Sequence, residues 1–410
     1  MGWMLLNDKK KIYDRRNYMI RVVDSIMGNG KTTWAINYMN ANPQKRFIYI
    51  TPYLQEAERI VKKCPELQIK QPTDDITKQA SFLQMLKDGE NMAISHELFM
   101  RQEWSDAAQA CIREYGYTLI LDEVLEVVKA IQLSKADHRM LVETEKIVVG
   151  DDGRVTWTDK KYKGKFEPMK RMANSGTLIQ TEDHAVLWIM PAETLRVFSE
   201  IYVLTFMFNG SHMKHYLDLN GFAYQMCYVE GDELHEGVQN LAADKVRIHG
   251  LLDIYEGPLN VLGERDNAFS KNWWRNKRLL NVAAVRNDIC KYLRYICDAK
   301  SEESMWSVFA DMKKKCSPNG YSKGFCPCNA RATNAYKDRK YLAYMLNVYE
   351  NPEVVKWFAG HGIKVNQEAF ALSQLVQWIW RSQIRDGKPV KLYLPSKRMR
   401  RILLDWLDEK

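Results

Sequence analysis

The segment from Ser25 to Thr33 carries the strongest chemical signal in the sequence, because it combines closely spaced glycines with a lysine and threonines. Gly28 and Gly30 allow the backbone to wrap closely around a phosphate group, while several N–H groups and a helix N-terminus point at it. Lys31 is expected to reach the terminal phosphates and Thr32 to ligate magnesium. The alternative is a glycine-rich turn without a ligand. The predicted contacts to a nucleotide are Ser25, Met27, Gly28, Asn29, Gly30, Lys31, Thr32 and Thr33.

A pair of acidic residues supplies the second half of such a site. The apolar run from Tyr117 to Asp122 is typical of a buried parallel strand, and it ends in Asp122 and Glu123. Ligands of open α/β sheets bind at this carboxyl edge. Asp122 is therefore the candidate magnesium ligand and Glu123 the candidate base that orients an attacking water. The alternative is that both acids only begin a solvated helix.

Short β-type runs alternate with polar helical stretches, which predicts an α/β fold with a mostly parallel sheet. The segment from Leu141 to Phe166, with a turn signal at Gly150 to Gly153, predicts a β-hairpin within an insertion at about 141–175. The strands expected in the first sheet are Met19 to Val23, Arg46 to Thr51, Met92 to Ser95, Tyr117 to Asp122, Ala185 to Met190 and Tyr202 to Phe206.

A second lobe is expected after the region 225–275, where periodicity weakens and Gly, Asp and Glu accumulate. The predicted lobes are residues 1–235 and 236–410. The expected helices of the second lobe lie near Val282 to Cys297, Lys337 to Tyr349 and Glu368 to Ile384, and the expected strands at Met305 to Phe309 and Val390 to Leu394.

Composition excludes several classes of protein. A chain of 410 residues with 46% apolar and 27% charged residues is an ordinary globular protein. The 60 lysines and arginines exceed the 51 acids by 9, an excess that permits a polyanionic partner. The longest apolar runs, such as Ile201 to Phe208, are shorter than the roughly 18 to 20 residues that cross a bilayer, so no membrane partner is expected. Eight scattered cysteines without an export signal predict reduced thiols and a cytoplasmic location.

With both halves of an ATP site present, most of the chain resembles the superfamily 2 helicases, and more closely the helicase-like proteins of bacteriophages and prophages. The resemblance implies two RecA-like lobes with ATP and Mg²⁺ between them. Phe47 to Pro52 and Ile94 to Phe99 resemble motifs that touch a nucleic acid strand, and Leu204 to Phe206 resembles the motif that couples the two sites. Each could instead be an apolar strand ending in a polar turn. The implied nucleic acid contacts are Thr51, Pro52 and His96, the last of which could also be a hydrogen-bonded core histidine.

The segment from Gln377 to Arg385 resembles the superfamily's final motif, which supplies glutamine and arginine fingers across the cleft. Gln377, Arg381 and Arg385 are four residues apart, so on a helix they share one face. An arginine finger contributes on the order of 10³ to 10⁵ in rate. The usual pattern has glycine before the first arginine and arginines three residues apart, whereas Trp380 and a spacing of four occur here, so either arginine could be the finger. The alternative is a salt-bridged helix face.

Further nucleic acid contacts are suggested by two other segments. Asn329 to Asn334 resembles a loop that links strand contact to the nucleotide, which implies roles for Arg331 and Thr333. Trp273, Trp274 and Arg275 interleave aromatic rings with a cation, as a surface that stacks bases would. A solvated face is the alternative there, as it is for the basic clusters at Lys9 to Lys11 with Arg15 and Arg16, and at Lys397 to Arg401.

The cysteines Cys316, Cys326 and Cys328 could seed a zinc site, although a second C-x-x-C pair is missing. The leading hypothesis is an ATP-dependent DNA helicase or translocase that acts on single-stranded or forked DNA, with other replication proteins, in phage replication or recombination. Two alternatives remain open. One is a nucleotide-gated replication initiation or loading factor that does not unwind processively, and the other is a viral packaging ATPase of the terminase type.

Overall fold

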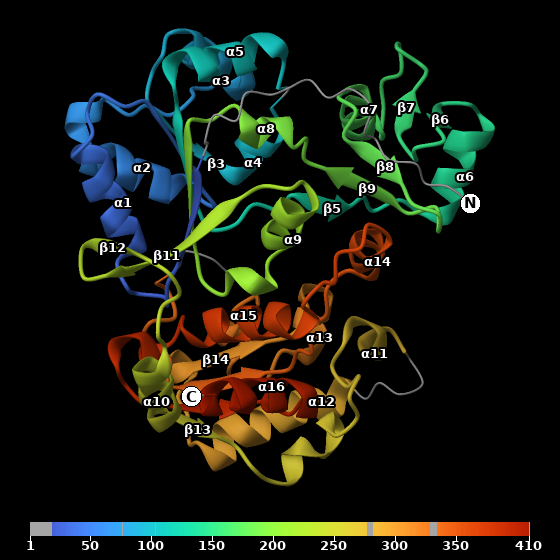
Figure 1. The fold of residues 1–410 in the computed structure, drawn as a ribbon. Coiled ribbons are helices and arrows are strands. Elements are labelled where there is room, and N and C mark those ends of the chain that lie inside the picture. The colour runs from blue at the N-terminus through green and yellow to red at the C-terminus, as the bar shows by residue number, and fades with distance from the viewer. Residues whose placement is uncertain (1–18, 76, 103, 277–281, 329–333, 410) are drawn as a thin grey trace.

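The computed structural model describes residues 19–75, 77–102, 104–276, 282–328 and 334–409, which form two α/β lobes placed one above the other in Figure 1. The first lobe contains a seven-stranded sheet in which all neighbours are parallel except β11 and β12. In spatial order its strands are β12 (Glu233–Glu236), β11 (Tyr224–Glu230), β1 (Met19–Asp24), β10 (Glu200–Thr205), β4 (Thr118–Asp122), β2 (Phe47–Thr51) and β3 (Met92–Ser95). The second lobe contains a parallel sheet in the order β13 (Leu252–Ile254), β16 (Val390–Tyr393), β15 (Tyr341–Tyr344) and β14 (Ser304–Ser307). The predicted α/β class with mostly parallel sheets is confirmed.

The first sheet is buried on both faces, as its continuous apolar runs require. Ile48 and Ile50 belong to one buried cluster, whereas Tyr49 between them belongs to the cluster on the opposite face. The helices that cover this sheet are α1 (Lys31–Asn40), α2 (Leu54–Lys63), α3 (Lys78–Lys87), α4 (His96–Met100), α5 (Asp106–Tyr115), α8 (Glu193–Arg196) and α9 (His212–Leu219). Serine side chains cap the N-termini of α4, α5 and α9, whereas α1 starts after Gly30 without a side-chain cap.

The insertion in the first lobe is larger than the predicted hairpin. The hairpin itself is confirmed, with β6 (Ile147–Val149) antiparallel to β7 (Val155–Trp157). It lies between α6 (Lys135–Glu143) and α7 (Glu167–Asn174), beside an antiparallel sheet of β5 (Val128–Ala130), β9 (Val186–Ile189) and β8 (Leu178–Gln180). The prediction that Ala185 to Met190 joins the main sheet is therefore wrong. A tight turn lets this apolar run pair with β8 directly before it, and the main sheet instead contains β11 and β12.

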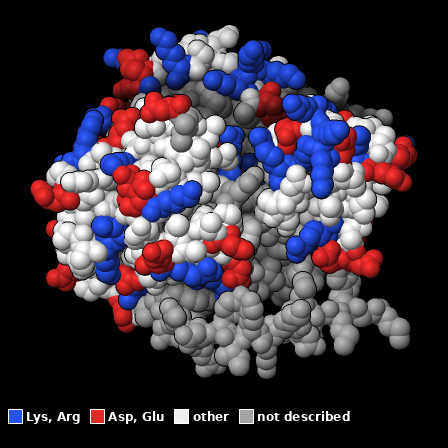
Figure 2. Space-filling model, turned by 90° about the horizontal axis from the view of Figure 1, so that it is seen from above, with Lys and Arg blue, Asp and Glu red and all other residues white. Residues whose placement is uncertain are grey.

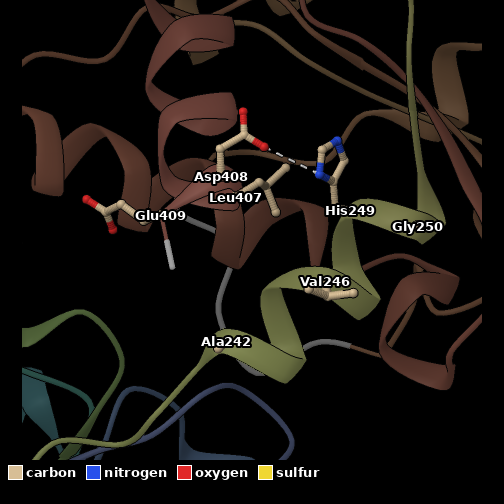
Figure 3. Close-up of a pocket in the computed structure, with 7 residues that line it drawn as sticks. All are labelled: Ala242, Val246, His249, Gly250, Leu407, Asp408 and Glu409. Atoms are coloured by element: carbon tan, nitrogen blue, oxygen red, sulfur yellow. Dashed lines mark ion pairs between the residues drawn. The ribbon is translucent and has the colours of Figure 1, made fainter.

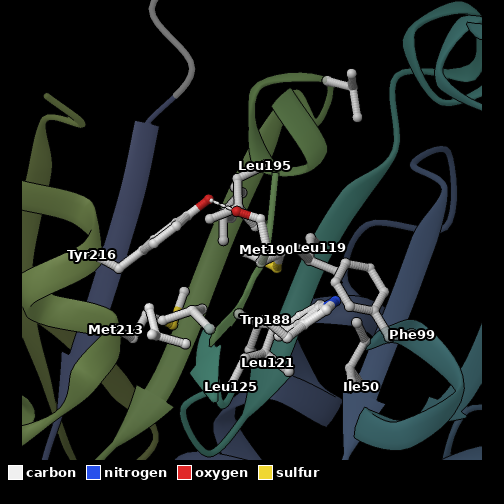
Figure 4. Close-up of a cluster of buried hydrophobic side chains, with 14 of the residues drawn as sticks. Ile50, Phe99, Leu119, Leu121, Leu125, Trp188, Met190, Leu195, Met213 and Tyr216 are labelled. Atoms are coloured by element: carbon white, nitrogen blue, oxygen red, sulfur yellow. Dashed lines mark hydrogen bonds between the residues drawn. The ribbon is translucent and has the colours of Figure 1, made fainter. Parts of the chain in front are cut away.

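Figure 4 shows how the insertion packs on the core of the first lobe. Trp188 from β9 lies among the sheet residues Ile50, Leu119 and Leu121. The hydroxyl of Tyr216 on α9 donates a hydrogen bond to the carbonyl of Met190 at 2.9 Å. The end of the insertion is thus held against the same core that positions the carboxyl ends of the parallel strands.

Two predictions for the second lobe are wrong. The segment predicted as a helix from Lys337 to Tyr349 contains strand β15, because its tyrosine, leucine and alanine side chains are buried on both faces of a strand that pairs with β14 and β16. The helix predicted from Glu368 to Ile384 ends at Ile379. The helices of this lobe are α10 (Ala242–Leu251), α11 (Lys271–Arg275), α12 (Val282–Lys291), α13 (Lys313–Cys316), α14 (Pro352–Gly360), α15 (Gln367–Ile379) and α16 (Lys397–Asp408).

The two lobes touch along α15. Ile26 of the phosphate loop and Phe206 after β10 belong to the same buried cluster as the side chains of α15 and α16. Gly210, just before α9, approaches α15 so closely that a Cβ atom there would lie 2.5 Å from the carbonyl carbon of Ala369. Any larger residue at position 210 would force the lobes apart.

His215 on α9 makes this interface sensitive to acid. Its Nε2 accepts the backbone N–H of Asn366 in the second lobe at 3.4 Å. Burial lowers the pKa of His215 to about 4, and the nearby charges of Lys214 and His212 act in the same direction. In the unfolded chain a histidine titrates near pH 6.5, so below that pH the unfolded state binds the proton first. We expect the free energy of unfolding to fall by about 1.5 kcal/mol between pH 6.5 and 5 from this group.

Urea unfolding of the full chain at pH 6.5 and pH 5 measures this effect. His215→Gln should flatten the pH dependence by about that amount, because glutamine takes up no proton in this range. His361→Gln, which changes an exposed histidine beside α14, is the matched control and should keep the dependence of the unaltered chain. An unchanged dependence in His215→Gln would contradict the prediction.

Candidate nucleotide site

The loop between β1 and α1 has the backbone geometry of a phosphate-binding loop. Gly28 and Gly30 have φ angles of +90° and +82°, a region that glycine enters without strain. Within the described residues, the N–H groups of Gly28, Gly30, Lys31 and Thr32 donate to no acceptor. Unpaired amides at the start of a helix attract an anion, so this loop fits the phosphates of a nucleotide.

The side chains around the loop fasten it to the rest of the first lobe. Ser25, which stands where the strict phosphate-loop pattern has glycine, accepts the N–H of Val229 on β11 through its Oγ at 2.8 Å. Asn29 Nδ2 donates to the carbonyl of Val229 at 3.4 Å. Met27 packs against the core of the second lobe, and Thr33 is exposed. Ser25 and Asn29 therefore shape the loop, while the amides remain available to a ligand.

Lys31 lies among acidic side chains at the loop. Its Nζ donates to the carbonyls of Ser25 at 2.5 Å and Ile26 at 3.2 Å. Burial lowers the pKa of Lys31, and the negative charges of Glu123, Asp24 and Asp122 oppose that shift. The three acids thus lie close enough to Lys31 to act on its charge, and they place the carboxylate strand opposite the loop.

Strand β4 carries Asp122 at its carboxyl end, two positions from β1 in the sheet, with β10 between them. Burial raises the pKa of Asp122 to about 7, and repulsion from Glu123 adds to the shift. A hydrogen bond of 2.9 Å from the Tyr49 hydroxyl acts in the opposite direction, as does the charge of Lys31. Tyr49 also makes a side-chain hydrogen bond with Thr32. Tyr49 therefore links the two predicted magnesium ligands, and a divalent cation there would favour the charged form of Asp122.

Glu123 occupies a strained backbone position. Its φ angle of +73° is uncommon for a residue other than glycine. Its N–H donates to the carbonyl of Leu204 on β10 at 2.9 Å, which holds the turn in place. Such strain at the end of a strand is typical of functional sites, where it aims a side chain.

Asp24 and Tyr49 also belong to the site, although the sequence did not predict them. The carboxylate of Asp24 accepts the N–H groups of Met207 at 2.8 Å and Phe208 at 3.0 Å. It therefore ties the phosphate loop to the segment after β10, which contains the predicted coupling motif. Position in the sequence was the available signal, because Tyr49 lies in a predicted strand that borders the site and Asp24 directly follows another.

The predicted finger residues do not share one helical face. Gln377 lies near the end of α15, but Arg381 lies beyond it and Arg385 lies in a separate 3₁₀ turn. Ser382 starts that turn, because its Oγ accepts the N–H of Ile384 instead of letting α15 continue. Arg385 is exposed, and its Nη1 donates to Asn334 Oδ1 at 2.8 Å.

Trp380, the residue before Arg381, lies against the phosphate loop. Its Nε1 is 3.7 Å from the position that a Cβ atom on Gly28 would occupy. Arg381 is partly buried, and its charge lowers the pKa of the Cys326 thiol against the larger effect of burial, which places the guanidinium near that thiol. The segment that carries Arg381 therefore borders the site, whereas Arg385 is directed elsewhere.

The predicted nucleic acid residues are scattered. Thr51 is 0% exposed, whereas Pro52 is partly exposed. The ring of His96 makes a hydrogen bond of 3.0 Å through Nε2 to the carbonyl of Asp122, as a structural histidine would. Arg331 and Thr333 lie outside the described residues, as does the basic cluster before residue 19.

The predicted stacking surface on α11 is wrong for its two rings. Trp273 and Trp274 are 7% and 5% exposed and belong to a buried cluster of the second lobe, so neither ring offers a face to a base. Arg275 beside them is exposed. In the basic cluster on α16, Arg400 is buried against the carbonyls of Leu394 and Pro395.

The cysteines do not assemble a metal site in the described part of the chain, where no three His, Cys, Asp or Glu side chains are arranged to hold an ion. Cys316 and Cys326 are both buried, and burial raises the pKa of each thiol to about 12, which disfavours the thiolate that zinc requires.

Among the residues that the structure describes, no helix combines the length and the apolar character needed to cross a bilayer.

Two pockets differ in whether they border the phosphate loop. One, of about 630 Å³, lies near the lobe interface and is bordered by Gly28 to Gly30 of this loop and by the turn of the β11–β12 hairpin. The other, of about 500 Å³, lies between α10 and the end of α16, where His249 and Asp408 form an ion pair of 3.6 Å (Figure 3). No residue of the phosphate loop borders this second pocket, so only the first is part of the candidate site.

Comparisons with known proteins identify homologous sequence along nearly the whole chain. A family model described as the YonV C-terminal Rossmann-like domain matches residues 246–407, and one described as the YonV middle domain matches residues 128–188. The SPbeta prophage-derived protein YonV of Bacillus subtilis (strain 168) is 37% identical over 410 residues, which cover 95% of this chain and 99% of that protein.

Among solved structures, similar chains include an XPD helicase, with a TM-score of 0.47 and 12% identity over 95% of this chain and 96% of that one. Xpd4 of S. tokodaii has a TM-score of 0.49 and 10% identity over 95% of this chain and 94% of that one. Similarity at this level does not identify a shared activity.

Proposed function

The chain belongs to the family of the prophage protein YonV, and on that premise we propose that it is an ATP-dependent helicase or translocase that moves on nucleic acid. One observation carries the proposal. Unpaired amides of the phosphate loop and the acids at the end of β4 lie close together around Lys31, and the Trp380 ring of the second lobe borders the same loop.

Each residue at this place has a distinct role in the proposal. The loop amides and the Lys31 ammonium bind the phosphates. Thr32 and Asp122 hold Mg²⁺, with Tyr49 orienting both oxygen ligands. Bound Mg²⁺ neutralises charge on the phosphates of ATP. Glu123 accepts a proton from the attacking water, and Arg381 approaches from the second lobe to stabilise the charge that develops.

Contacts between the lobes would couple ATP hydrolysis to a movement of one lobe relative to the other. Asp24 joins the phosphate loop to the Met207–Phe208 backbone, and Ile26 and Phe206 reach into the core of the second lobe. A change at the phosphates would therefore move the lobes relative to each other. We propose single-stranded or forked DNA as the track, with a role in phage replication or recombination beside other replication proteins, in the cytoplasm of a bacterial host.

Positive surface for such a polymer is available on the insertion. Figure 2 shows lysine and arginine side chains gathered on the right of the view, the side on which Figure 1 places α6 and α7. The insertion contributes exposed cations on and before α7, namely Lys160, Lys161, Lys163, Lys165 and Arg171. Backbone phosphates are the partner that such a group of cations fits, with an affinity that falls as salt rises.

Steady-state hydrolysis of ATP by the full chain, with and without single-stranded DNA, duplex DNA or RNA, tests the function. We expect at least tenfold stimulation by single-stranded DNA and displacement of a strand from forked DNA. ATP-switched DNA affinity without displacement would favour a loading factor, and DNA cutting with packaging-type activity would favour a terminase-like motor. No hydrolysis under any condition would refute the proposal.

A further inference from the structure

The pocket beside the phosphate loop is built from both lobes. The β11–β12 hairpin forms one wall with Tyr228, Glu230 and Gly231. The other wall is formed by Gln239, in the segment that leads into α10, and by Asp244 in the first turn of that helix. The carbonyl oxygen of Gly231 is 3.6 Å from the place that a Cβ atom on Gly30 would take, so the hairpin turn lies directly over the loop. With about 630 Å³, the pocket is within the range of small-molecule sites.

The walls differ in chemistry from the phosphate loop. Tyr228 presents a flat ring that is stacked on His235, with ring centres 5.2 Å apart. Glu230 and Asp244 place carboxylates in the pocket, and these disfavour another phosphate there. Carboxylates do accept hydrogen bonds from ribose hydroxyls, and aromatic rings stack on nucleobases. A ligand with a phosphate end and a nucleoside end matches this polarity.

We propose that this pocket binds the base and ribose of the nucleotide whose phosphates the loop holds, an inference that rests on the proposed function. Tyr228 stacks on the base, and Glu230 accepts hydrogen bonds from the ribose hydroxyls. Gln239 cannot turn freely, because its Oε1 accepts the N–H of Ile26 at 3.0 Å. Its side-chain amide is thereby held at the boundary between the phosphates and the nucleoside.

The same walls connect the nucleoside to the second lobe. Asp244 on α10 forms an ion pair with Arg247 at 2.9 Å. The Arg247 guanidinium lies 5.8 Å from the centre of the Trp380 ring, which borders Gly28. A nucleoside in this pocket would therefore lie beside Asp244, which is connected through Arg247 to the Trp380 ring that precedes Arg381.

Isothermal titration of the full chain with Mg²⁺ and either ATP or inorganic tripolyphosphate tests the inference. We expect the unaltered chain to bind ATP more tightly than tripolyphosphate. Tyr228→Ala should weaken ATP binding by roughly 10-fold or more, as loss of a base stack does, and leave tripolyphosphate binding within twofold. Glu230→Gln, at an exposed position where folding is not at risk, should also weaken ATP binding alone. Tyr295→Ala, at a tyrosine that is 76% exposed in the second lobe, is the matched control and should change neither affinity.

The outcomes separate this inference from the function on which it rests. Equal affinities for ATP and tripolyphosphate in the unaltered chain would overturn the nucleoside pocket and leave the phosphate loop in place. Equal weakening of both ligands by Tyr228→Ala, with no effect of Glu230→Gln on either ligand, would also overturn the pocket. Binding of neither ligand by the unaltered chain would overturn both proposals.

Discussion

Glu123→Gln is expected to slow ATP hydrolysis by roughly 10²- to 10⁴-fold while the affinity for ATP stays within a few fold, because glutamine cannot accept the proton of the attacking water. The substitution keeps the size of the side chain. It also keeps the backbone hydrogen bond from residue 123 to Leu204 that holds the strained turn. Single-turnover hydrolysis, measured together with the dissociation constant for ATP, separates the chemical step from binding.

Glu126→Gln is the matched control for that experiment. Glu126 lies three residues further along, is exposed, and forms a surface ion pair with Lys129 at 3.3 Å. Surface pairs of this kind contribute little, so hydrolysis should be unchanged. If Glu123→Gln hydrolysed ATP at the rate of the control, the carboxylate at the end of β4 would not be the base. Lys31→Ala distinguishes a lost binding site from a lost base, because it should weaken the binding of ATP itself.

The sequence predicted those parts of the site whose signals are local. The glycines and lysine of the phosphate loop follow a strand directly, and Asp122 and Glu123 end an apolar run, so each half is visible within about ten residues. The contacts that join the halves are not local. Tyr49 reaches Asp122 from another strand, and Asp24 reaches the backbone after β10. No spacing in the sequence encodes such pairs, because they depend on the order of strands in the sheet.

The fold predictions were wrong for segments whose amino-acid composition is compatible with two different local structures. Strand β15 contains leucine and alanine, which are good helix formers, yet it is a central strand buried on both faces. The apolar run of β9 looked like a strand of the main sheet but pairs with β8 next to it. Trp273 and Trp274 have the composition of a stacking surface and lie in the core. In each case burial and pairing, which are tertiary properties, decided the outcome.

Charge around the phosphate loop supports the proposal that a divalent cation takes part in the reaction. Three carboxylates act on the Lys31 ammonium, and two of them, Asp24 and Asp122, have pKa values raised by burial. This excess of buried acid is costly unless further positive charge is supplied. Magnesium, the Lys31 ammonium and a cation from the second lobe together would balance the acids and the phosphates. We therefore expect the second lobe to contribute that cation when ATP is hydrolysed.

Arg381→Ala should lower the rate of hydrolysis by roughly 10³-fold with little change in ATP affinity, because the guanidinium is expected to act only on the charge of the transition state. The structure favours Arg381 over Arg385, since Trp380 beside it borders Gly28 whereas Arg385 is exposed and bound to Asn334. Arg385→Ala is thus the matched control and should retain the rate of the unaltered chain.

Arg381→Lys tests whether the planar geometry of the guanidinium is needed. Lysine keeps the positive charge, but it should retain only a small part of the rate of hydrolysis. A large loss in Arg385→Ala together with normal hydrolysis in Arg381→Ala would transfer the role to Arg385, and it would show that the lobes rotate much further than their present contacts along α15 allow.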